Sequence, residues 1–257
     1  MVSSHQSGTR LMKHRLSNTF GQSRVSLEER EKLVRSVFNR VAGRYDLMND
    51  LMSMGVHRLW KWIFCREVNK ANGDAADDQT FVDLAGGTGD IAEALIDGQR
   101  NVLILDPSEE MMSVAEKRLG SSCRYITAAA EDIPLEDESV DVLTISFGIR
   151  NTTDIAKSLQ EITRVLKPGG HFYCLEFSTP YFWLRPFYDA WSRIVIPRLG
   201  ALVAGHPDAY TYLVESIREF PAQEEMAEMI RTAGLEDVSY SNLTFGIACI
   251  HRGEKPL

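Results

Sequence analysis

The segment TFVDLAGGTGD at 80–90, followed by NVLILD ending at Asp106, constrains the fold more than any other part of the sequence. An apolar run breaks into glycines, and an acid closes the next apolar run roughly twenty residues later, as a nucleotide-binding βαβ crossover requires. Gly86, Gly87 and Gly89 allow the backbone to turn tightly from a buried strand into a helix. The sequence therefore predicts a ligand at the exposed N-terminus of that helix, with the hydroxyls of a ribose on Asp106.

The glycine spacing also limits what this ligand can be. The segment DLAGGTG is not the G-x-G-x-x-G of a pyrophosphate cradle, and no P-loop lysine follows it. Asp83, just before the glycines, would repel a pyrophosphate but could receive an ammonium group. A ligand with a ribose and a positively charged amino-acid end fits both acids, and S-adenosylmethionine has that structure. A dinucleotide-dependent oxidoreductase fits them poorly.

Composition sets the wider bounds. With 257 residues, 44% of them apolar, the chain can bury one full core, and we expect a single domain over 28–257. A flexible N-terminal segment over 1–27 carries four basic residues and no acid, which suits either an organelle-targeting sequence or an ordinary polar terminus. The formal net charge of −8 argues against nucleic acid as a partner.

Cysteine spacing and hydropathy exclude two further classes. The four cysteines form no C-x-x-C pair and no Cys/His metal-binding pattern, so we expect reduced, buried thiols and no metal. No apolar stretch reaches the roughly 18 residues that a membrane-spanning helix needs. We therefore expect no segment that crosses a membrane.

Hydrophobic periodicity predicts the order of helices and strands. A capping box at Ser26 marks a helix start, and a second helical stretch is expected from about Asp50 to Asn69, so that helices occupy 28–70. Strands and helices then alternate, which predicts a parallel, doubly wound sheet. The expected strands are 80–84, 101–105, 123–127, 140–147 and 171–177, and the expected helices are 88–97, 108–119, 153–166 and 222–233. The runs 236–242 and 243–252 are separated by little more than a tight turn, so they should form an antiparallel hairpin at one sheet edge.

An insertion over 181–220 is rich in aromatic residues, beyond what a parallel sheet needs. It contains Tyr181, Phe182, Trp183, Phe187, Tyr188, Trp191, Tyr210, Tyr212 and Phe220. Such an insertion beyond the carboxyl ends of the strands can be a lid over a hydrophobic substrate. It can equally be an extra helical layer that packs on the sheet, and we expect part of it to do so.

Several segments resemble the class I methyltransferases, namely DLAGGTGD, LILDPSEEMM and the turn RVLKPGG. More narrowly, the chain resembles the quinone-ring C-methyltransferases of ubiquinone and menaquinone biosynthesis. YDLMNDLMSMGVHRLW at 45–60 matches the first signature of that family, and RVLKPGGHFYCLEFS at 164–178 matches the second through Glu176 and Ser178. The resemblance runs from about Thr19 to Gly253. It implies a Rossmann-like α/β fold with a mostly parallel, seven-stranded sheet.

The resemblance also implies a reaction. A methyl group would pass from S-adenosylmethionine to a ring carbon of a prenylated quinol, which is demethylmenaquinol, 2-polyprenyl-6-methoxy-1,4-benzoquinol, or both. A non-catalytic scaffold that binds the cofactor, or a methyltransferase for another lipid or small molecule, are the alternatives. Such enzymes are expected in the bacterial cytoplasm at the surface of the inner membrane, or in the mitochondrial matrix. A homodimer and an association with other quinone-biosynthesis enzymes both remain open.

The family pattern carries cofactor roles onto matching positions. Asp83 would take the amino group of the methionine, Asp106 would hold the ribose, and either Met111 or Met112 would lie near the adenine. The full set implied for cofactor binding is Asp83, Gly86, Thr88, Gly89, Asp106, Pro107, Met111, Ala129, Ala130 and Ser146. Ala129 has no polar side chain for the adenine edge, so only backbone contact is expected there.

Catalytic roles by the same resemblance fall on Arg150, Asn151 and Tyr45. Arg150 would stabilise the developing phenolate or steer a water that takes the proton. The alternative for Arg150 is a surface ion pair with an acid such as Asp154, and the alternative for Tyr45 is core packing. A histidine on a helix is more often structural, and His57 is expected to be so rather than a base.

A membrane surface is the expected meeting place with a long-tailed substrate. Arg185, Arg193 and Arg198 alternate with aromatic residues over 181–199. Such a pattern suits contact with anionic lipid headgroups without crossing the bilayer.

Overall fold

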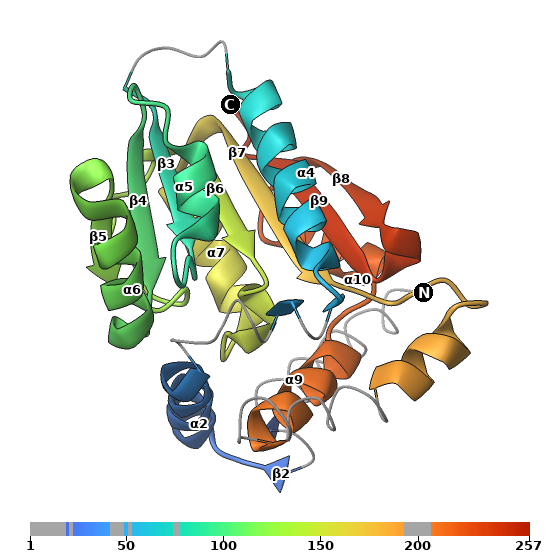
Figure 1. Ribbon diagram of the computed structural model, residues 1–257. Helices are drawn as coiled ribbons and strands as arrows, with labels where there is room; N and C mark the ends of the chain where they lie inside the picture. Colours follow the sequence, from blue (N-terminus) through green and yellow to red (C-terminus); the bar gives the residue numbers. More distant parts are fainter. Residues whose placement is uncertain (1–18, 21–22, 42–48, 51–52, 74–77, 193–206) are drawn as a thin grey trace.

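The computed structural model describes residues 19–20, 23–41, 49–50, 53–73, 78–192 and 207–257. A seven-stranded sheet forms its centre, in the order β5-β4-β3-β6-β7-β9-β8 (Figure 1). The strands are β3 (Thr80–Leu84), β4 (Asn101–Asp106), β5 (Arg124–Thr127), β6 (Val140–Ser146), β7 (Leu166–Phe177), β8 (Glu236–Leu243) and β9 (Ala248–Glu254). The first five run parallel, while β9 is antiparallel to β7 and β8. This confirms the predicted doubly wound sheet with an antiparallel hairpin at one edge.

Helices cover both faces of the sheet. One face carries α4 (Val56–Ala71), α5 (Asp90–Leu95) and α6 (Glu109–Leu119), and the other carries α7 (Ile155–Val165) and α10 (Gln223–Thr232). Alternate residues of one strand supply the two cores: Phe81 packs with the α4 side, whereas Val82 and Leu84 pack with the α7 side. Burial on both faces explains the nearly unbroken apolar runs in the central strands.

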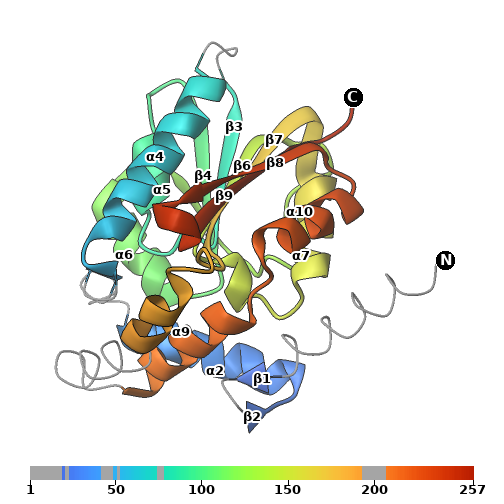
Figure 2. The ribbon, with the colours of Figure 1, turned by 90° about the vertical axis from the view of Figure 1, so that its right-hand side faces the viewer.

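Two more helices lie beyond the carboxyl ends of the parallel strands. These are α2 (Leu27–Val41) and α9 (Pro207–Glu219), and both views place them side by side below the sheet (Figure 2). Ahead of α2, the two-residue strands β1 (Thr19–Phe20) and β2 (Ser23–Arg24) pair antiparallel. The edge of the sheet where the sequence predicts a ligand is therefore covered by helices from both ends of the chain.

The predicted capping box at Ser26 is present. The Ser26 backbone N–H donates to Glu29 Oε2 at 3.0 Å, and the Glu29 N–H donates to Ser26 Oγ at 3.2 Å. The helix expected from Asp50 to Asn69, in contrast, is interrupted: residues 49, 50 and 53 are helical, and the continuous helix α4 begins at Val56. Met54 and Gly55 take left-handed φ values of 52° and 76°, and a right-handed helix cannot continue through them.

The strand predictions at 80–84 and 140–147 closely match β3 and β6, whereas the second hairpin strand begins later than predicted. A short 3₁₀ turn at Thr244–Gly246 precedes β9. Phe245 there has a left-handed φ of 57°, so the chain reverses through this turn before pairing resumes at Ala248. The four cysteines are buried free thiols, as predicted.

The aromatic insertion divides into inner and outer residues. Tyr212 and Phe220 are buried, which fits the predicted packing layer. Phe182 and Phe187 are instead 87% and 72% exposed. Tyr210 lies in α9, but its side chain falls outside the described residues. The insertion therefore both packs and presents an apolar surface.

Two strand-to-loop turns meet closely at the point where the strand order reverses. β3 and β6 are neighbours whose chains continue to opposite sides, so the loops after them flank a crevice. The first residue of each loop, Ala85 and Phe147, takes a left-handed φ, 52° and 54° respectively. A Cβ on Gly148 would lie only 2.5 Å from the Ala85 Cβ, so the second loop needs glycine there.

We predict that Gly148→Ala lowers the free energy of unfolding by about 1–3 kcal/mol, because the added methyl group overlaps the Ala85 Cβ. Adding Ala85→Gly to this variant should restore part of the loss, since it removes the overlapping atom. Urea unfolding of the two single variants and the double variant measures both effects. Additive losses in the double variant would contradict the predicted contact.

Candidate active site

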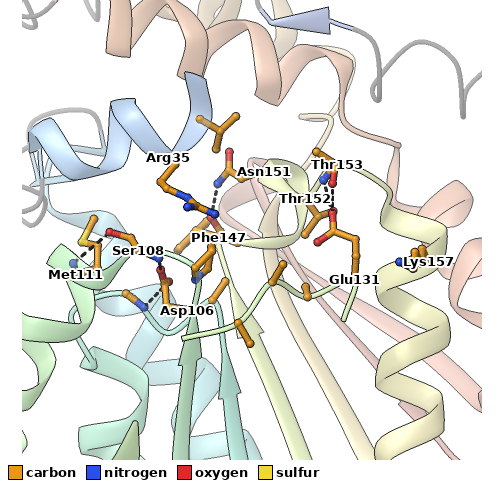
Figure 3. A pocket seen from close by; sticks show the side chains of 18 residues that line it. Arg35, Asp106, Ser108, Met111, Glu131, Phe147, Asn151, Thr152, Thr153 and Lys157 are labelled. Carbon is orange, nitrogen blue, oxygen red and sulfur yellow. Dashed lines mark hydrogen bonds between the residues drawn. The ribbon is translucent and has the colours of Figure 1, made fainter. Parts of the chain in front are cut away.

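A cavity of about 330 Å³ opens at the carboxyl edge of the sheet, beneath α2 (Figure 3). It is lined by the turns that follow four neighbouring parallel strands and by one helix from outside the sheet. These residues are Val34 and Arg35 of α2, Ala85 and Gly87, Asp106, Pro107, Ser108 and Met111, residues 128–131, Phe147, Gly148 and residues 151–153, with Lys157 at the far side. A second cavity shares Arg35 and Pro107 with it and extends it along the outside of α6.

The Asp106 carboxylate connects two of the turns that line the cavity. Its Oδ2 accepts a hydrogen bond from the Gly87 N–H at 3.0 Å, and its Oδ1 accepts one from the Ser108 N–H at 2.8 Å. Burial raises the pKa of this carboxyl to about 6, although the two N–H groups lower it. The carboxylate therefore fixes the turns after β3 and β4 while lining the cavity.

Asp83 lies behind the glycine turn rather than in the cavity lining. Its Oδ2 accepts from the Ala92 N–H at 3.1 Å, and its Oδ1 accepts from the Thr144 hydroxyl at 3.2 Å. Burial raises its pKa to about 7. Gly86 passes directly over this carboxyl, since a Cβ there would lie 2.8 Å from Oδ2. The predicted contact between Asp83 and an ammonium group stays a prediction.

The remaining glycine-turn positions shape the helix that follows. Gly89 is the residue before α5 and has a φ of 84°, and a Cβ on it would meet Leu119 at 2.8 Å. Thr88 is buried, and neither Thr88, Gly86 nor Gly89 lines the cavity. Gly87, which the sequence prediction omitted, does line it. The sequence held one signal for this role. Gly87 lies in the glycine turn, and its N–H could have been expected to donate to Asp106 at the end of β4.

The other positions predicted to bind the cofactor also divide into residues that line the cavity and residues that do not. Pro107, Met111, Ala129 and Ala130 all line the cavity. Met112 points instead into the core on the α4 side of the sheet, so Met111 is the methionine that faces the cavity. Ser146 is outside the lining, and its Oγ is buried without a hydrogen-bond partner among the described residues.

Arg150 is buried in an ion pair. Its Nη1 lies 2.7 Å from Glu176 Oε1 and donates to the Phe147 carbonyl at 2.7 Å. Both charged side chains are at most 2% exposed. The alternative surface pair with Asp154 is wrong, because the Asp154 carboxylate caps α7 by accepting from the Lys157 N–H. Arg150 does not line the cavity, and its predicted catalytic role stays a prediction.

Asn151 does line the cavity, and it joins two parts of the fold. Its Nδ2 donates to the Phe147 carbonyl at 3.3 Å, and its Oδ1 accepts from the Tyr212 hydroxyl of α9 at 3.2 Å. Tyr45 lies outside the described residues. His57 is buried beside Ser53, with 3.0 Å between Nδ1 and Oγ, and burial lowers its pKa to about 4. His57 is therefore neutral at neutral pH, as a structural histidine would be.

Helix α2 closes the top of the cavity, which the sequence did not predict. Arg30 is 2% exposed and donates to the Arg150 carbonyl at 3.2 Å and to the Thr152 carbonyl. Arg35 extends from the same helix toward Phe147 (Figure 3). Glu131 accepts hydrogen bonds from the Thr153 hydroxyl and the Asp154 N–H. These contacts join segments distant in sequence, so periodicity within α2 could not reveal them.

The described residues contain no group of three or more His, Cys, Asp or Glu side chains arranged to hold a metal ion. What the cavity offers is a buried carboxylate, a glycine turn, an aromatic ring and a basic side chain from α2. That set suits an organic ligand with hydroxyl groups and a flat ring.

Comparison with known proteins decides the family. The model of the ubiE/COQ5 methyltransferase family matches residues 25–255. The chain belongs to this family. A relative named ubiquinone/menaquinone biosynthesis C-methyltransferase UbiE, from Rubrivivax gelatinosus, is 56% identical over 93% of this chain and 94% of its own. One of the same name from Brucella anthropi is 47% identical over the same shares of the two chains.

Solved structures support the fold alone. A SAM-dependent methyltransferase from Thermotoga maritima matches with a TM-score of 0.59 and 21% identity, over 86% of this chain and 99% of its own. Phosphoethanolamine N-methyltransferase 2 of Haemonchus contortus, in complex with S-adenosyl-L-methionine, matches with a TM-score of 0.59 and 16% identity, over 76% of this chain and 53% of its own. Both share the class I methyltransferase architecture of the family.

The buried ion pair generates a stability prediction. Glu176→Gln should lower the free energy of unfolding by about 3–5 kcal/mol, because it leaves the Arg150 charge buried without its partner. Adding Arg150→Met should recover part of this loss. Urea unfolding checks both variants. Glu224→Gln, in an exposed pair with Arg231, is the matched control and should cost less than about 1 kcal/mol. Equal losses for Glu176→Gln and Glu224→Gln would contradict the prediction.

Proposed function

We propose that this protein transfers a methyl group from S-adenosylmethionine to a ring carbon of a prenylated quinol. The observation that carries the proposal is the cavity at the switch point of the sheet, with the Asp106 carboxylate held beside the glycine turn in a member of the ubiE/COQ5 methyltransferase family. The names of the UbiE relatives support a demethylated menaquinol or ubiquinol precursor as the substrate class.

The residues present fit S-adenosylmethionine. Asp106 would accept hydrogen bonds from the two ribose hydroxyls, and Met111 would pack against the adenine. The Ala129 and Ala130 positions leave room for the flat ring without a polar side chain. Asp83, which lies beneath Gly86, would accept a hydrogen bond from the amino group of the methionine. Thr88 and Gly89 would shape the turn. When bound, this cofactor supplies an electrophilic methyl group on a sulfonium.

The chain's own residues then have three tasks. They must place the acceptor carbon in line with the methyl group, exclude water, and favour the ionised form of the neighbouring quinol oxygen. Loss of that oxygen's proton makes the ring carbon nucleophilic; the carbon forms its bond to the methyl group as the bond to sulfur breaks. The ring carbon finally loses its own proton to water, which restores the aromatic ring as a quinolate, and the oxygen regains a proton from solvent to give the methylated quinol.

Arg150, Asn151 and Tyr45 are the proposed residues for the quinol oxygen. The Arg150 guanidinium is held at the start of the loop after β6, and its Nε has no hydrogen-bond partner among the described residues. A fixed cation next to the cavity would stabilise a developing phenolate without acting as a base. Asn151 faces the cavity and would orient the oxygen or a water beside it.

Contact with a membrane surface belongs to the same proposal, because a long prenyl tail partitions into lipid. Of the three arginines predicted to meet headgroups, Arg185 lies within the described residues and is exposed, whereas Arg193 and Arg198 lie outside them. The protein would thus meet its substrate at the bilayer surface. None of the helices in the described segments is long and apolar enough to span a bilayer.

Incubation with methyl-labelled S-adenosylmethionine tests the reaction. We expect label in demethylmenaquinol or in the benzoquinol when the ring is reduced, and little in the oxidised quinone, because only the quinol can ionise to a nucleophilic ring. Label in neither ring would sink the enzyme proposal in favour of a cofactor-binding scaffold. Equal label in both redox states would sink the phenolate mechanism.

The raised pKa of Asp106 gives a pH prediction. Its carboxyl loses an acceptor site when protonated, so affinity for S-adenosylhomocysteine should rise as pH increases through about 6. The folding stability of the unliganded protein changes with pH in the opposite direction. Because burial raises the folded-state pKa of Asp106, the free energy of unfolding falls as pH rises from about 4 to about 6. Calorimetric titration across this range measures the affinity. Asp106→Asn should remove the rise near pH 6 and weaken binding roughly tenfold or more at pH 8. An unchanged pH profile in this variant would contradict the role of Asp106.

A further inference from the structure

Exposed apolar side chains gather where α4, the turn before β9 and the start of the insertion come together. We call this set the aromatic face. It consists of Leu59, Trp62, Phe182, Trp183, Phe187 and Phe245, which are between 47% and 87% exposed. So many large apolar side chains in water are unusual for a surface without a binding partner.

Direct contacts join the three segments. The Trp183 and Phe245 rings meet edge to face, with 5.1 Å between centroids, and the Tyr181 N–H donates to the Phe245 carbonyl at 2.9 Å. On the other side, Trp60 Nε1 donates to Thr244 Oγ1 at 2.7 Å, which ties α4 to the same turn. Both ribbon views place the lower part of α4, this turn and residues 185–192 on one side of the molecule (Figures 1 and 2). The turn before β9 therefore contacts both α4 and the start of the insertion, and so brings together the three segments that carry these side chains.

The charge of this surface differs from that of the whole chain. The formal net charge of the protein is −8, but two arginines of the segments that carry the aromatic face, Arg66 and Arg185, are exposed. Arg66 stacks over the Trp62 ring at 5.3 Å, and neither Arg66 nor Arg185 pairs with an acid in the described part of the chain. The nearby acids Asp50, Glu67 and Asp189 form ion pairs with Arg58, Arg252 and Arg218 respectively. Apolar side chains bordered by unpaired arginines complement an anionic lipid surface.

Packed aromatic side chains lie between the turn before β9 and the cavity. Trp60 lies directly beneath the face, and its ring contacts Phe147 and Phe177 at centroid distances of 6.3 Å and 6.0 Å. Phe147 and Phe177 are themselves 4.8 Å apart, and Phe147 lines the cavity. One packed aromatic cluster therefore joins the turn before β9, through Trp60, to the lining of the cavity.

We propose that the aromatic face docks on the anionic surface of a lipid bilayer, with its apolar side chains in the headgroup boundary and Arg66 and Arg185 on lipid phosphates. The proposal rests on the proposed function in that a prenyl tail would remain in the bilayer while its ring enters the cavity that Phe147 lines. The commitment to lipid follows from the unpaired arginines, since an apolar protein partner would not require them.

Flotation of the full chain with vesicles tests the proposal. We expect binding to vesicles of phosphatidylcholine mixed with phosphatidylglycerol, and weaker binding to phosphatidylcholine alone. Phe182→Ser combined with Phe187→Ser should weaken binding to both vesicles about tenfold or more. Arg66→Gln combined with Arg185→Gln should leave binding to phosphatidylcholine unchanged and weaken binding to the anionic vesicles about fivefold per arginine.

Two variants outside the face are matched controls. Tyr240→Ser removes an exposed aromatic ring that packs on His251, on the α10 side of the sheet, and Lys117→Gln removes an exposed cation of α6. Both should bind vesicles as the unmodified protein does. Binding of the unmodified protein to neither vesicle, or equal loss in the controls, would overturn the proposal. The unmodified protein could instead be a dimer that binds no vesicles, while the Phe182/Phe187 variant is a monomer. That result would show that the aromatic face joins two copies of the chain.

Methylation assays separate this proposal from the reaction itself. In detergent, the Phe182/Phe187 variant should methylate a short-tailed quinol at the unmodified rate, and it should be slower only on long-tailed quinol in vesicles. If the unmodified protein methylates a quinol but does not bind vesicles, the docking proposal is contradicted and the proposed function is not. Vesicle binding without methylation of any quinol would sink the proposed function alone.

Discussion

The buried ion pair between Arg150 and Glu176 is the interaction on which the rest of the site depends. It fastens the loop after β6 to the end of β7, deep in the core. That loop is then the docking point for two helices from opposite ends of the chain: Arg30 of α2 donates to its carbonyls, and Tyr212 of α9 donates to Asn151. Because removal of one charge leaves the other stranded in a region of low polarity, the pair sets one position for the whole loop.

The acids around the cavity share a second property. Burial raises the pKa of Asp83 to about 7 and that of Asp106 to about 6, and it also raises the pKa of Glu176. Arg150 offsets the charge of Glu176, whereas ionisation of Asp83 and Asp106 destabilises the unliganded fold. A ligand that carries an ammonium and a sulfonium would offset that cost. The burial that destabilises the unliganded fold therefore also makes the site favour a cationic ligand. Backbone N–H groups at Gly87, Ala92 and Ser108 keep these carboxylates in place until then.

Elements of regular structure were largely predictable, because their signals are local. Nearly unbroken apolar runs marked β3 and β6, and the reciprocal bonds of Ser26 and Glu29 marked the start of α2. The break in the helix before Val56 was missed because the left-handed backbone at Met54 is not typical of methionine. The partner of Arg150 was also missed: Asp154 is near in sequence, but Glu176 lies on the adjacent strand.

The sequence by itself determined the α/β class, the glycine turn with its two acids, and the family resemblance, because each depends on residue type and short spacing. Tertiary structure alone decided which of those residues face the cavity. Gly87 and Met111 line it while Gly86 and Met112 do not, since neighbouring residues on a turn or helix point in different directions. It also decided that α2 covers the site and that α4 meets the turn before β9. Those contacts join segments more than a hundred residues apart, and only the folded chain brings them together.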